Sequence, residues 1–156
     1  MKRFTQIRTL MLMVVMLLGT TIPASAIERP FALKGTGVAT LVTDDAGHLI
    51  GAIPTGSGTA TYLGQWTVSG NVHYIPDQNG VLHSSGEASL VAANGDRLQF
   101  QIDGILDPVS AIDQGVFRFV GGTGLFEGAS GEANFVVSIN PVTGGFDLTL
   151  VGKINF

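Results

Sequence analysis

Apolar and polar side chains alternate with a period of two residues along almost the whole chain after residue 26. In the segment 97–106, Leu98 and Phe100 share one face, while Gln99 and Gln101 occupy the other. This period is typical of strands that bury one face and expose the opposite one. No window longer than a turn carries the 3.6-residue period of an amphipathic helix, so the chain is expected to be all-β.

Turn-forming residues separate the alternating segments. These segments are 33–42, 58–75, 87–93, 97–106, 115–120, 131–139 and 146–156, and turn sequences occupy 44–47, 77–80, 94–95 and 140–145. The segment 58–75 is longer than a normal strand, so we interpret it as two strands, or as one strand sharply bent near Gly64 and Gly70. Asn94-Gly95 is a strong hairpin signal because both positions tolerate positive φ.

Strands that follow one another through short turns form an antiparallel meander, and bends at glycines allow such a sheet to close on itself. Closure removes the exposed edges that an open sheet would present. We therefore expect residues 27–156 to form one domain, a closed antiparallel barrel of about eight strands in meander order, with a β-sandwich as the second choice.

The first 26 residues have the features of a secretory signal peptide. Lys2, Arg3 and Arg8 precede an apolar run from 10 to 18, and Ala24-Ser25-Ala26 supplies a small-residue cleavage site. The apolar run is shorter than the roughly 20 residues that span a bilayer, so no helical membrane anchor is expected. A secreted or periplasmic location is predicted.

Charge and cysteine content exclude several functions. Three of the eight Lys and Arg residues precede residue 27 and all twelve Asp and Glu residues follow it, so the formal charge of the domain is 5 − 12 = −7. A protein this acidic is not expected to bind nucleic acid. The absence of cysteine excludes disulfides and thiolate ligands for a metal.

Several glycine-marked motifs resemble those of a known barrel family. The segments 58–66 (GTATYLGQW), 92–98 (AANGDRL), 121–131 (GGTGLFEGASG) and 152–156 (GKINF) are similar to those of secreted bacterial proteins with an allene-oxide-cyclase-like barrel. The resemblance implies an eight-stranded antiparallel barrel like those of plant allene oxide cyclases and dirigent proteins. Those plant families steer reactive apolar molecules inside the barrel, and many are trimers, which implies a possible homo-oligomer, a trimer or a dimer.

The candidate ligand-binding residues are aromatic side chains placed on the apolar face by parity: Tyr62, Trp66, Tyr74, Phe100 and Phe119. Their hydroxyl and indole groups could orient a small apolar ligand in an otherwise apolar pocket. The same parity directs the carboxylates of Glu87, Asp103, Glu132 and Asp147 outward. The interior is therefore expected to be nearly free of ionisable groups, which disfavours acid–base catalysis, and no catalytic residue is assigned.

No metal or cofactor is expected. A hairpin through 77–80 could bring His73 near His83, but no third ligand is identifiable, and His48 lies apart in the sequence. The segment 121–124 (GGTG) lacks the spacing and the following helix of a dinucleotide-binding loop, so it is interpreted as a turn.

Three functions remain as hypotheses. The first is an exported soluble barrel that binds a small hydrophobic molecule or acts as a scaffold. The second, implied by the resemblance, is an allene-oxide-cyclase-like isomerase acting on an apolar substrate. The third is a small outer-membrane barrel, in which the apolar face would meet lipid and the polar face would line the lumen.

Overall fold

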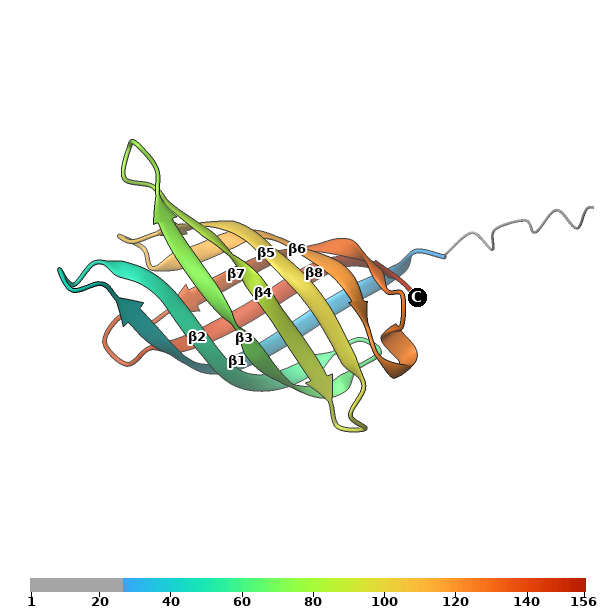
Figure 1. The fold of residues 1–156 in the computed structure, drawn as a ribbon. Coiled ribbons are helices and arrows are strands. Elements are labelled where there is room, and N and C mark those ends of the chain that lie inside the picture. The colour runs from blue at the N-terminus through green and yellow to red at the C-terminus, as the bar shows by residue number, and fades with distance from the viewer. Residues whose placement is uncertain (1–26) are drawn as a thin grey trace, which may run out of the picture.

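Residues 27–156, the part of the chain described by a computed structural model, form a closed eight-stranded antiparallel barrel with the strands in meander order (Figure 1). The strands are β1 (Arg29–Thr43), β2 (Leu49–Ala60), β3 (Gly64–Pro76), β4 (Leu82–Ala92), β5 (Arg97–Asp107), β6 (Ile112–Gly122), β7 (Ser130–Ile139) and β8 (Gly145–Asn155), with a short 3₁₀ helix, η1 (Gly124–Phe126), before β7. The barrel closes through pairing of β1 with β8. The expected fold class is confirmed, and the expected signal peptide lies outside the described residues.

The long segment 58–75 is divided between two strands, as one of the two interpretations predicted. The break falls at residues 61–63, where Tyr62 adopts a positive φ of 66°, and Gly64 follows it with a φ of 65°. β2 begins at Leu49, well before the predicted segment. The first half of β2 contains Pro54, and a proline in the middle of a sequence segment argues against a paired strand because it removes a backbone donor. The sequence pattern therefore does not indicate a strand here.

Pro54 also leaves a gap in the pairing of β2 with β3. The register runs through Gly51–His73 and Ala52–Val72, stops, and resumes at Gly56–Val68. The register is the same on both sides of the gap, so the strands remain aligned where the pairing is missing.

The apolar face of each strand points into the barrel. Phe100, Phe119, Phe135 and Phe146 are all buried, whereas Gln99 and its polar neighbours along β5 are exposed. An outer-membrane barrel requires the reverse arrangement, with a polar lumen. The apolar interior therefore contradicts that hypothesis. Among the described residues no helix is long and apolar enough to cross a membrane.

The two ends of the barrel differ. At one end, which we call the packed end, the chain termini of the domain meet the turns 61–63 and 93–96 and the helix η1 (Figure 1). There Phe126 is fully buried and its ring contacts Phe156 at a centroid distance of 5.4 Å. The other end, which we call the turn end, consists of the hairpin turns 44–48, 77–81, 108–111 and 140–144.

Trp66 fills the interior near the packed end. Its indole lies against Gly35 and Gly58, where a methyl group on either glycine would overlap the ring. Glycine at these two positions therefore makes room for the largest side chain of the core. The indole nitrogen is buried and has no hydrogen-bond partner among the described residues.

Candidate functional site

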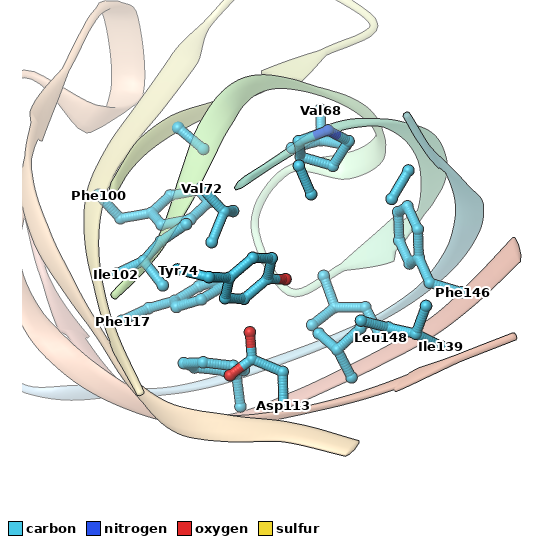
Figure 2. A pocket seen from close by; sticks show the side chains of 16 residues that line it. Val68, Val72, Tyr74, Phe100, Ile102, Asp113, Phe117, Ile139, Phe146 and Leu148 are labelled. Atoms are coloured by element: carbon cyan, nitrogen blue, oxygen red, sulfur yellow. The ribbon is translucent and has the colours of Figure 1, made fainter. Parts of the chain in front are cut away.

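The interior contains a pocket on the side of the turn end. Its volume is about 70 Å³ and its wall is almost entirely apolar (Figure 2). The lining side chains are Ala39, Ala52, Pro54, Val68, Val72, Tyr74, Ala88, Phe100, Ile102, Asp113, Phe117, Phe135, Val137, Ile139, Phe146 and Leu148. All eight strands contribute to this wall and none of the turns does, so the pocket is part of the barrel itself.

One carboxyl group lies in this apolar wall. Asp113, the second residue of β6, is only 4% exposed and accepts a 2.7 Å hydrogen bond at Oδ1 from the hydroxyl of Ser84 on β4. Ser84 is itself 1% exposed. The hydroxyl of Tyr74, near the end of β3, lies close to the same carboxyl group in the pocket wall (Figure 2).

The surroundings change the acidity of both groups. Burial raises the pKa of Asp113 above its usual range, and the hydrogen bond from Ser84 and the nearby Tyr74 hydroxyl oppose part of this rise. Burial also raises the pKa of Tyr74 well above its ordinary value, and the negative charge of Asp113 adds to the increase. The pocket therefore contains a carboxylic acid and a phenol close together, and burial makes both of them lose a proton less readily than they would in water.

Asp113 corrects the expectation of an interior nearly free of ionisable groups. The predicted segment began at Gly115, and its alternation extends two residues further towards the N-terminus in the structure. Asp113 then shares the inward face with Gly115, Phe117 and Phe119. Extending the parity across residues 112–114 would have identified this carboxyl group from the sequence.

Two of the five candidate ligand-binding residues line the pocket, namely Tyr74 and Phe100. Trp66 and Phe119 are buried but are not part of its lining, and the ring of Phe119 packs against Phe31 at 5.1 Å. Tyr62 does not point into the barrel. It lies in the turn between β2 and β3, is 40% exposed, and its ring contacts Phe156 at 5.3 Å.

The histidines do not converge. The Nδ1 atom of His48 lies 3.0 Å from Asp44, the Nε2 atom of His83 lies 3.7 Å from Asp77, and His73 contacts Asn71. Within residues 27–156 no group of three or more metal-ligating side chains is present.

The arrangement supports two kinds of chemistry. A carboxyl group and a phenol in an apolar wall can orient one polar group of a bound molecule by hydrogen bonds. The same pair can donate or accept a proton at a reacting atom, because a buried carboxyl group with a raised pKa carries its proton nearer to neutral pH.

No protein-family model matches this sequence, and no curated protein matches it. Solved structures do match the fold. The pterocarpan synthase dirigent protein PsPTS1 aligns with a TM-score of 0.55 at 14% sequence identity, covering 83% of this chain and 95% of that protein. The pterocarpan synthase dirigent protein GePTS1 aligns with a TM-score of 0.51 at 15% identity, covering 85% and 88%. The chain therefore shares the barrel fold of the dirigent proteins.

Proposed function

We propose that the barrel binds a small, largely apolar molecule in the pocket on the side of the turn end, with one polar group of that molecule directed at Asp113 and Tyr74. The observation that supports this proposal most strongly is the single buried carboxyl group in an apolar wall. A carboxyl group in such a place weakens the fold unless it is compensated, so its presence is expected where it serves recognition. The pocket therefore supports a ligand-binding function over a purely structural, scaffolding one.

The size of the pocket limits how a ligand can bind. Its volume of about 70 Å³ is well below the roughly 300–1,000 Å³ of sites that enclose a drug-sized molecule. One end group of the ligand therefore enters the pocket, and the rest of the molecule extends towards the turn end.

A ligand panel tests this function directly. Phenols, terpenoids and fatty acids would be titrated into isotopically labelled protein while methyl and aromatic resonances are followed by NMR. We expect at least one class to shift the resonances of Ala39 and Ala52, which line the pocket. An Ala39→Leu variant, which narrows the pocket, should lose the ligand-induced shift of Ala52, whereas Thr40→Leu adds the same side chain on the exposed face and should keep it. No response across the panel would refute the proposal.

A second candidate is an isomerase acting on an apolar substrate, and the pairing of Asp113 with Tyr74 is the observation that favours it. The barrel is shared with proteins described as pterocarpan synthases, although only the fold connects them to this chain. Opening of an apolar epoxide would be followed by chiral chromatography. Asp113→Asn should abolish any acceleration over buffer, and Asp147→Asn, an exposed carboxylate on β8, should retain it.

We also propose that the protein is exported after removal of residues 1–26. The support is the sequence of the N-terminal segment. Mass spectrometry of the protein recovered from its native cells should give a chain that begins at Ile27, and an intact N-terminus would contradict export through this signal.

A further inference from the structure

Negative charge is concentrated at the turn end of the barrel. The turns and the strand residues that flank them directly contain no Lys or Arg. The acidic residues in this region are Asp44, Asp45, Asp77, Asp107, Asp113 and Asp147. The turn end is the left-hand side of the barrel in Figure 1. A molecule that approaches the pocket from this side meets a negative potential.

The positive charges of the described residues lie away from this end. Arg29, Arg97 and Lys153 are at or near the strand termini of the packed end, where Lys153 pairs with Glu28 at 2.8 Å. Lys34 and Arg118 lie further along their strands, and Arg118 pairs with Asp103 and Glu132 on the outer surface. No cation among these residues lines the pocket or shields Asp113.

Aromatic rings form one side of the pocket next to the carboxyl group. The rings of Phe100 and Phe117 are stacked at a centroid distance of 4.3 Å, and Phe117 and Phe135 are 4.5 Å apart. Tyr74 adds a fourth ring (Figure 2). The faces of aromatic rings carry partial negative charge and attract cations, as in sites that bind quaternary ammonium groups.

These observations together define a chemical class of ligand. We propose that the pocket binds an apolar cation, a hydrophobic amine or a quaternary ammonium compound, whose charged head enters first and lies between Asp113 and the aromatic rings. This inference rests on the proposed ligand-binding function and adds the charge of the ligand. An anionic ligand such as a fatty acid is disfavoured, because its carboxylate would face both the acidic turn end and Asp113.

Two probes of nearly the same shape separate charge from apolar contact. Phenyltrimethylammonium and tert-butylbenzene differ by a nitrogen in place of a carbon, and 4-tert-butylbenzoate supplies the anion. Their affinities for the wild-type protein would be measured by NMR titration at low and high salt. We expect the cation to bind roughly tenfold more tightly than the hydrocarbon, with an advantage that shrinks in high salt, and the anion to bind most weakly.

Variants assign the charge preference to the pocket. Asp113→Asn should bring the affinities for the cation and the hydrocarbon close together, whereas Asp147→Asn, on the outer surface of the same end, should largely preserve their difference. If Asp113→Asn fails to fold, the affinities of the wild-type protein for the cation and the hydrocarbon still test the proposal. Equal binding of cation and hydrocarbon by the wild type would overturn this inference and leave ligand binding intact. A preference that persists in Asp113→Asn would also overturn it. If none of these probes nor any member of the broader panel bound, the proposed function itself would fail.

Discussion

The hydroxyl of Ser84 on β4 donates a 2.7 Å hydrogen bond to the carboxyl group of Asp113 on β6, and the two residues reach each other across β5. The β5 residue between them is Gly104, which pairs with Ser84 on one side. A Cβ atom at Gly104 would lie 2.7 Å from the Ser84 hydroxyl oxygen. The missing side chain of one residue therefore permits the contact between the other two.

Ser84→Ala should lower the free energy of unfolding by about 1–3 kcal/mol, because the buried carboxyl group loses its hydrogen-bond donor. Urea unfolding followed by the fluorescence of Trp66, the single tryptophan, would measure the change. Ser85→Ala, the neighbour on the outward face, is the control and should change stability by less than about 0.5 kcal/mol. Equal losses in both variants would show that the contact with Asp113 contributes nothing.

Gly104→Ala should destabilise the barrel by about 1–3 kcal/mol, because the new methyl group displaces the Ser84 hydroxyl and crowds the ring of Phe135. The same substitution in a Ser84→Ala background should cost less, since one of these clashes has been removed. A double-mutant cycle on urea midpoints measures the difference. Strict additivity of the two changes would contradict the proposed crowding.

Asp113 should make stability fall as the pH rises. Its pKa is raised in the folded state, so the folded chain binds more protons than the unfolded chain between about pH 4 and the raised pKa. The contribution of this group is fully present below that window and is lost as the pH passes through the folded pKa. Asp113→Asn should remove this part of the pH dependence of the unfolding free energy, and Asp147→Asn should not. Parallel pH profiles for the wild type and Asp113→Asn would refute the assignment.

Ala111→Gly should increase the free energy of unfolding by up to about 1 kcal/mol and so raise the melting temperature. Ala111 lies in the turn before β6 with a φ of 55°, a conformation that glycine adopts without strain. Ala46→Gly is the matched control, because Ala46 is an exposed turn residue without a positive φ. It should gain nothing, since glycine there only adds freedom to the unfolded chain. Differential scanning calorimetry of both variants decides between relief of strain and a general effect of glycine.

The alternation of side chains predicted the barrel because strand parity alone determines which residues face a shared interior. It did not predict how far along the barrel axis each inward residue lies. Trp66 and Phe119 were correctly placed inside, but only the strand register shows that they do not line the pocket. Tyr62 was misplaced because parity was carried through a turn, where it has no meaning. Asp113 was missed because the predicted strand began only at Gly115, although Asp113 has the same parity as the inward-facing residues of that strand.

The barrel wall is least strongly hydrogen-bonded beside Pro54, between β2 and β3. Every other neighbouring pair of strands has a continuous or nearly continuous ladder, whereas β2 and β3 lack paired residues between Ala52–Val72 and Gly56–Val68. Pro54, Val68 and Val72 also line the pocket. Widening a closed barrel elsewhere means breaking hydrogen bonds, but here the donor is already missing. A ligand too large for the pocket would therefore separate β2 and β3 beside Pro54 more easily than any other pair of strands, and Pro54 already lines the pocket.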